Sequence, residues 1–352
     1  MSLASVKQWF FRHKRGIFVW GGLIIVTLLF LGGIAANVSP ALRGPDDWRW
    51  TYAVPGAPGR HLLPAAVILA YVVVVFLWGR KLLQTERPSP WLLRGYLLYT
   101  AAAIPIIQLS LLAAESPDVV EQLYFRTISW GSSGFFSVGS IIDDGRSFLA
   151  DYPALMPQFP VHPQRYPPGI PLTFYLSRSL FALWPGLAER VGANLRLYQC
   201  QDLTLMRIAN PVMATAVIQM ALPLIGGLII FPLFGLARRA FNRRAAVWTV
   251  AFYPLLPSFA LWAGRWDQFH PLLSVTAWYL FYVGLTRQRR WLILAAGLVV
   301  SLASFLSFGL LALLVPMGLW ALLWLAVQRN GRSLASIFID GAIFTGGLLA
   351  VW

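Results

Sequence analysis

Nine apolar runs, most of them close to the length that crosses a bilayer core, constrain this chain more than any other feature. About 20 apolar residues in a helix span the hydrocarbon layer. Charged residues make up only 12% of the chain, whereas a soluble domain carries about 25%. We therefore predict an all-α polytopic membrane protein with about nine transmembrane helices. The runs cover residues 17–36, 62–79, 92–113, 211–236, 245–263, 268–285, 291–306, 308–327 and 337–352.

The distribution of basic residues predicts the orientation of these helices. More than half of them lie in short segments beside the ends of the runs, within residues 7–15, 80–94, 238–244, 287–290 and 329–332. Given nine spans, all five segments fall on the same side of the membrane. If the N-terminus is cytoplasmic, that side is the cytoplasm, which satisfies the positive-inside rule. This pattern explains the net charge of +15 without a nucleic-acid partner. We predict a multi-pass protein of the plasma membrane with a cytoplasmic N-terminus and an uncleaved first helix.

Two longer segments, residues 37–61 and 114–210, then lie on the non-cytoplasmic side of one transmembrane domain that covers residues 1–352. Loops of such length are uncommon unless they are functional or disordered. The second is rich in apolar and aromatic residues, which disfavours disorder. We therefore expect it to carry the function. The last run ends at Trp352 without a polar tail, so either the final helix finishes there or the chain is part of a longer protein.

Pairs of carboxylates occur in both outer segments. Asp46 and Asp47 precede Trp48 in a group of aromatic residues. This group is typical of an aromatic belt at the bilayer surface, and it equally suits a sugar site with a carboxylate beside aromatic rings. Asp143 and Asp144 precede a glycine, as in an ordinary turn. Two adjacent carboxylates are too few to define a divalent cation site, so we assign no metal ion and no other cofactor.

A proline-rich stretch, residues 151–171, follows the second carboxylate pair. Prolines at this density exclude helix and central strand, so we expect a rigid, turning backbone. His162 and Arg165 lie inside it, and these two side-chain types suit a phosphate. Residues 172–184 are apolar but too short to span, and we predict a helix on the membrane surface. Asp267 lies at another outer junction. It either pairs with Arg265 on the surface or lines one outer cavity together with the residues of the outer segments.

The run from Tyr166 to Leu172, Tyr-Pro-Pro-Gly-Ile-Pro-Leu, resembles the outer turn of the GT-C superfamily of membrane glycosyltransferases. Residues 236–244, Leu-Ala-Arg-Arg-Ala-Phe-Asn-Arg-Arg, resemble an inner loop of the same superfamily. The likeness is to the group of family 39, protein O-mannosyltransferases and aminoarabinose transferases, and it covers about residues 115–285. Two features depart from the pattern. Tyr166 stands where the family often has histidine, and an extra helical hairpin separates the two outer segments.

The resemblance implies a glycosyltransferase that moves a sugar from a polyprenyl-phosphate-linked donor to an acceptor lipid, glycan or protein. Transfer would occur on the non-cytoplasmic side, with inversion and with an acidic outer-loop residue as general base. That base maps to Asp46 or Asp47 by position after the first span, or to Asp143 or Asp144 by position before the proline turn. The implied donor-phosphate and substrate contacts are His162, Arg165, Tyr166, Arg126 and Trp48.

Two other classes of function compete with this hypothesis. A transporter or lipid flippase requires charged residues deep within its spans, and the predicted spans hold almost none apart from Asp340 near the start of the last run. A non-catalytic membrane scaffold would tolerate substitution of the outer residues. Membrane lipids are partners in every case, and no inverted repeat of the transporter kind is evident.

Overall fold

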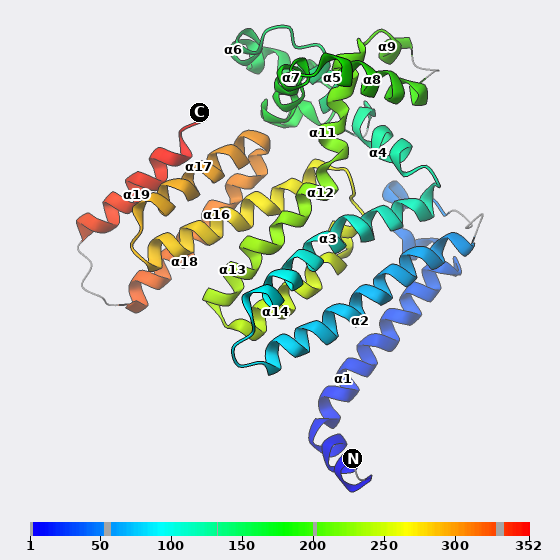
Figure 1. Ribbon diagram of the computed structural model, residues 1–352, viewed down its shortest axis with the longest axis vertical. Coiled ribbons are helices and arrows are strands. Elements are labelled where there is room, and N and C mark those ends of the chain that lie inside the picture. The colour runs from blue at the N-terminus through cyan, green and yellow to red at the C-terminus, as the bar shows by residue number, and fades with distance from the viewer. Residues whose placement is uncertain (1–2, 53–57, 132, 200–202, 329–333) are drawn as a thin grey trace. The chain divides into compact units, whose positions relative to one another are not determined.

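Helices form every regular element in the part of the chain that the computed structural model describes, residues 3–52, 58–131, 133–199, 203–328 and 334–352 (Figure 1). The chain divides into two compact units, Met1–Pro58 and Gly59–Trp352. The first unit contains α1 (Leu3–Ala35) followed by short 3₁₀ turns. The longer helices of the second unit are α2 (Leu62–Gln84), α3 (Pro90–Glu115), α13 (Ile230–Ala240), α14 (Arg243–Phe252), α16 (Phe269–Thr286), α17 (Arg290–Leu306), α18 (Leu314–Gln328) and α19 (Leu334–Leu348).

Within the described residues, four helical segments are long and apolar enough to cross a membrane, which indicates a multi-pass membrane protein as the sequence predicts. They are Gly59–Gln84, Pro90–Glu115, Asn210–Ala240 and Phe308–Val327. The third joins α10 (Asn210–Met213), α11 (Val217–Met220), α12 (Leu222–Gly226) and α13 through 3₁₀ turns. Shorter apolar helices cover Gly21–Ala35, Arg290–Leu306 and Ala335–Leu348.

Prolines decide where several helices end. The run 245–263, expected as one span, is not a single helix, because α14 ends at Phe252 and α15 covers only Pro257–Ala260. Pro254 and Pro257 supply no backbone N–H, so the ladder of helical hydrogen bonds cannot continue through them. Between the two helices the chain turns at Leu256, and after α15 it leads to the start of α16. This turn brings residues 262–270 to the candidate site described below.

The bundle of α2, α3, α13 and α14 is held by tyrosines as well as by apolar packing. The Tyr71 hydroxyl donates to the carbonyl of Ala251 at 2.7 Å, and the Tyr96 hydroxyl donates to that of Val247 at 3.0 Å. Both rings are buried. A buried hydroxyl needs such a partner, since an unpaired one costs free energy, and these bonds fix α14 against α2 and α3.

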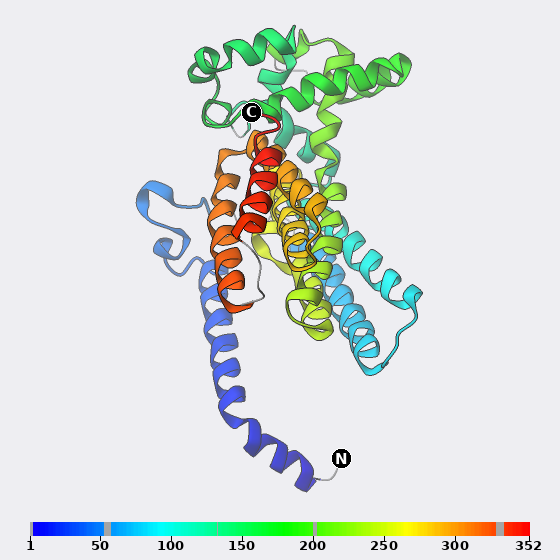
Figure 2. The ribbon, with the colours of Figure 1, turned by 90° about the vertical axis from the view of Figure 1, so that its left-hand side faces the viewer.

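Short helices between α3 and α10 gather at one end of the second unit (Figures 1 and 2). They are α4 (Val119–Ile128), α5 (Phe135–Ser140), α6 (Gly145–Leu155), α7 (Gly169–Ala182), α8 (Pro185–Arg196) and α9 (Leu203–Met206). The expected helix at 172–184 is therefore present as α7. The expectation that the proline-rich stretch excludes helix is wrong at both ends, because α6 includes Asp151 and Pro153 and α7 includes Gly169 and Pro171. Pro153 is tolerated near the end of a helix that Asp144 caps.

Candidate functional site

A cavity of about 430 Å³ lies where the proline-rich stretch meets the turn between α15 and α16. Its walls combine two imidazoles, one from the proline-rich stretch and one from the first turn of α16, with a carboxylate, a guanidinium and four aromatic rings. Carboxylates beside aromatic rings are a suitable surface for a sugar, since the rings pack on its apolar face and the carboxylate accepts from its hydroxyls. The lining residues are Ser133, Phe135, His162, Tyr166, Trp262, Arg265, Trp266, Asp267 and His270.

Asp267 and His270 are neighbouring titratable side chains of this cavity. Asp267 lies in the 3₁₀ turn Trp266–Gln268, and His270 lies three residues later in the first turn of α16. The Asp267 Oδ1 and His270 Nδ1 atoms are 3.9 Å apart. The Asp267 side chain is 65% exposed and that of His270 only 13%. The carboxylate is thus open to a ligand, while the imidazole is largely buried beside it.

Two neighbours adjust the charge of the cavity. Burial lowers the pKa of the Arg265 guanidinium, Arg126 lowers it further, and Asp267 opposes both effects. An arginine remains protonated in proteins all the same, so the cavity keeps a positive charge beside its carboxylate. Burial, followed by the negative charge of Asp267, raises the pKa of the Tyr166 phenol. The phenol therefore stays a neutral hydrogen-bond donor at neutral pH.

A buried glutamine fixes the segment that carries Asp267. Gln219, on α11, is fully buried. Its Oε1 accepts from Trp266 Nε1 at 2.9 Å, and its Nε2 donates to the carbonyls of Gly264 at 3.0 Å and Arg126 at 3.2 Å. Gly264 adopts a left-handed conformation with φ of +71°. Three elements, α4, α11 and the turn before α16, are joined through this one side chain.

The proline-rich stretch contributes His162 and Tyr166 to the cavity. Hydrogen bonds and packing hold this stretch in place. The Tyr152 hydroxyl of α6 donates to the carbonyl of Tyr166 at 2.6 Å. The Tyr166 ring meets Phe135 edge to face, with 5.1 Å between ring centroids. A Cβ at Gly169 would lie 2.2 Å from the carbonyl oxygen of Phe305. Only glycine permits this close approach of the Pro-Pro-Gly turn to the end of α17.

The structure brings together two of the residues predicted as donor contacts, His162 and Tyr166. Asp267 joins them, as one of its two interpretations predicted. Arg165 is exposed and does not line the cavity. Arg126 does not line the cavity either, and it links the surrounding segments. Its guanidinium pairs with Glu115 at 2.9 Å and donates to the carbonyl of Ala263 at 3.1 Å.

The candidate base residues of the two outer segments have other contacts within their own units. Asp143 and Asp144 are exposed and do not line the cavity. Asp144 caps α6 by accepting from the Ser147 N–H at 2.7 Å, and this bond lowers the pKa of its carboxyl. Asp46 and Asp47 belong to the first unit, where Asp46 pairs with Arg49. The side chain of Trp48 lies outside the described part of the structure.

His270, which lines the cavity, and Gln219, which holds the segment beside it, are residues that the sequence interpretation missed. A histidine three residues after an aspartate at the start of an apolar run was the available signal for His270. Nothing local distinguishes Gln219, whose partners lie 45 or more residues away. Within the described residues, no group of three or more histidine, cysteine or acidic side chains is placed to hold a metal ion.

Comparison with known proteins adds no relative. The chain matches no model of a protein family, no curated protein and no solved structure. The cavity and its surroundings are therefore the basis for assigning a function.

Proposed function

We propose that this protein is a membrane glycosyltransferase that moves a sugar from a polyprenyl-phosphate-linked donor to an acceptor hydroxyl. The observation that carries the proposal is the meeting of Asp267, His270, Arg265 and aromatic rings in one cavity. The cavity lies beside the short helices, at the end of the bundle where a lipid-linked donor would present its sugar. The resemblance of the proline turn to GT-C enzymes points the same way, and Tyr166, the first residue of that turn, lines the cavity.

The proposal includes a topology. The apolar helices form about nine spans of the plasma membrane, with the N-terminus in the cytoplasm and the cavity on the non-cytoplasmic side. The arginines at the ends of α13 and α16 support this orientation by the positive-inside rule. A donor carried by a polyprenyl chain would then reach the cavity from within the outer leaflet.

In the proposed reaction Asp267 is the general base. Its carboxylate takes the proton of the acceptor hydroxyl as the hydroxyl oxygen bonds to the anomeric carbon. The bond from that carbon to the phosphate oxygen breaks, and its electron pair leaves with the polyprenyl phosphate. Direct displacement inverts the anomeric configuration. Asp267 suits this role because it lines the cavity and its side chain is 65% exposed.

The leaving phosphate gains negative charge, which cationic groups at the cavity wall stabilise. Arg265 supplies a permanent positive charge there, and His162 adds a second when it is protonated. Tyr166 donates a hydrogen bond to a sugar or phosphate oxygen. Trp262 and Trp266 pack against the sugar ring. His270 stays behind Asp267 and orients the carboxylate.

The test is sugar transfer in proteoliposomes that contain the whole chain, with a panel of labelled polyprenyl-phosphate hexoses and pentoses. We expect one donor to be consumed and the product to have the opposite anomeric configuration, which NMR of the product measures. A blank result across the panel would contradict the enzyme assignment. Retention of configuration would contradict direct displacement while leaving the enzyme class intact.

A further inference from the structure

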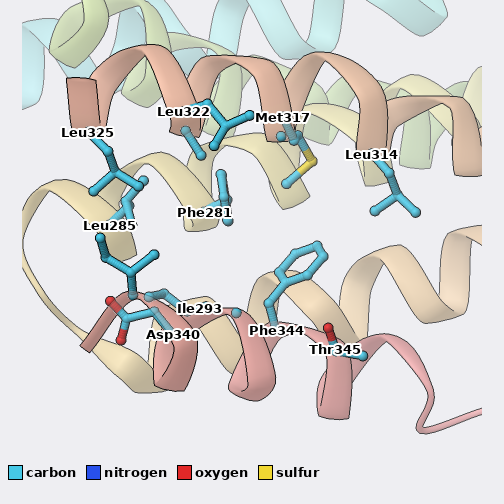
Figure 3. A pocket seen from close by; sticks show the side chains of 14 residues that line it. Phe281, Leu285, Ile293, Leu314, Met317, Leu322, Leu325, Asp340, Phe344 and Thr345 are labelled. Carbon is cyan, nitrogen blue, oxygen red and sulfur yellow. The ribbon is translucent and has the colours of Figure 1, made fainter. Parts of the chain in front are cut away.

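A second cavity, of about 400 Å³, lies among α16, α17, α18 and α19, and its walls are almost wholly apolar (Figure 3). Phe281, Met317 and Phe344 face one another across its middle, and Leu314 and Thr345 lie toward one end. It shares no lining residue with the candidate active site. The α18 wall is open to its surroundings, because only 6% of the Phe308–Val327 window is buried inside the protein.

The other end of this cavity is strongly polar. Asp340 lies there beside Leu285 and Leu325 (Figure 3), and it is only 8% exposed. Its Oδ1 atom accepts from Arg290 Nε at 3.2 Å. A buried carboxylate needs such a partner, because taking it out of water unpaired is costly. The ion pair thus places one guanidinium at the mouth of an apolar chamber.

More positive charge surrounds this mouth. Arg287 and Arg289 are exposed in the turn between α16 and α17, together with Arg290. Leu285 and Ile293, which flank this turn in the chain, both line the cavity. The turn thus carries three guanidinium groups, of which Arg290 pairs with Asp340, and Arg287 and Arg289 lie within three residues of Arg290 in the chain.

We propose that this cavity is a binding site for an anionic phospholipid, with one acyl chain among α16–α19 and the headgroup phosphate on Arg287 and Arg289. Basic pockets between transmembrane helices are a known way to hold anionic headgroups. Arginine suits a phosphate because its planar fork makes two parallel hydrogen bonds. The open α18 wall gives the lipid a path in from the bilayer. The site is independent of the proposed glycosyl transfer.

A phospholipid accounts for both ends of the cavity together. An apolar helix from a second copy of the chain would fill the middle but would leave the arginines without a counter-charge. A free phosphate would satisfy the arginines but not the apolar walls. An acyl chain attached to a phosphate matches the apolar length and the charged mouth at once.

Two glycines allow the cavity to be filled without disturbing its walls. A Cβ at Gly318 of α18 or at Gly341 of α19 meets nothing within 4 Å, and both residues line the cavity. The variants Gly318→Leu and Gly341→Leu therefore place side chains in the space we assign to the lipid. Gly346→Leu is the matched control, since its Cβ also meets nothing within 4 Å and it does not line the cavity.

The experiment is native mass spectrometry of the whole chain in detergent, delipidated and then titrated with phosphatidylglycerol or phosphatidylcholine. We expect one phosphatidylglycerol to bind in preference to phosphatidylcholine. Gly318→Leu and Gly341→Leu should each weaken that binding about tenfold or more, the loss expected when the acyl chain is displaced. Gly346→Leu should bind as the unmodified chain does. Equal thermal unfolding temperatures of the four proteins would establish that the cavity variants fold.

A charge variant tests the headgroup contact separately. Arg287→Gln/Arg289→Gln should abolish the preference for phosphatidylglycerol, whereas Arg238→Gln/Arg244→Gln, exposed arginines of another turn, should keep it. Equal binding of the two lipids to the unmodified chain would overturn the proposal. So would cavity variants that fold and retain the preference. Loss of a dimer in Gly318→Leu with lipid binding unchanged would identify a second copy as the occupant, and would also overturn it.

Discussion

Replacing Gln219 by leucine should destabilise the protein, because this buried side chain satisfies three polar groups at once. The Trp266 Nε1 donor at 2.9 Å and the Gly264 carbonyl at 3.0 Å both lose their bonds to Gln219. The Arg126 carbonyl keeps a bond from Arg265 Nη1 at 3.5 Å. Each buried group left without a partner costs about 1–3 kcal/mol. Two such groups predict a loss of about 2–6 kcal/mol in the free energy of unfolding.

The assay is unfolding in mixed detergent micelles, followed by tryptophan fluorescence. Gln158→Leu is the matched control, since Gln158 is exposed and makes only one bond, to the Ala154 carbonyl. Its substitution should change the free energy by no more than about 0.5 kcal/mol. Gln219→Glu would bury a carboxylate against the two carbonyl oxygens, so its loss should be at least as large as that of Gln219→Leu. If Gln219→Leu behaved like Gln158→Leu, the account of how the cavity wall is held would be refuted.

Two further variants test local features. Gly264→Ala should lower the free energy of unfolding by at least about 1 kcal/mol, because φ is +71° and the new Cβ would lie 2.8 Å from Leu123 Cδ2. Gly186→Ala is the control and should show no such loss, since a Cβ there meets nothing within 4 Å. Asp144→Ala removes the cap on α6 and its bond to the Ser147 N–H. Because the folded-state pKa of Asp144 is lowered, its contribution is present above the unfolded value of about 3.9 and is lost as pH falls through the lower folded value. Unfolding measured at decreasing pH should therefore lose part of its pH dependence in Asp144→Ala; an unchanged profile would contradict the cap.

The helical class followed from the sequence because apolar runs of bilayer length leave few other structures possible. Helix ends were harder to predict where prolines interrupt an apolar run. Residues 245–263 are apolar enough for one span, but Pro254 and Pro257 divide them. In contrast, Pro153 lies within α6. Asp144 caps the start of that helix, and the proline comes close to its end.

The site was only partly predictable, for a physical reason. The cavity joins residues near position 162 to residues near position 267, and no local pattern reports which distant segments meet. The proline-rich stretch marked His162 and Tyr166 correctly as neighbours in a rigid frame. It also marked Arg165, which is exposed outside the cavity. The paired carboxylates Asp143 and Asp144 drew attention as a motif, although Asp144 serves as a helix cap.

The most direct test of the central claim is the turnover rate of Asp267→Asn in the proteoliposome transfer assay, with Asp143→Asn as the matched control. Asparagine keeps the shape of the side chain but cannot accept the proton of the acceptor hydroxyl. The account predicts that kcat falls by about 10²–10⁴-fold in Asp267→Asn, while Asp143→Asn transfers at the rate of the unmodified protein. Full activity in Asp267→Asn, with transfer lost instead in Asp143→Asn or in Asp46→Asn/Asp47→Asn, would contradict it.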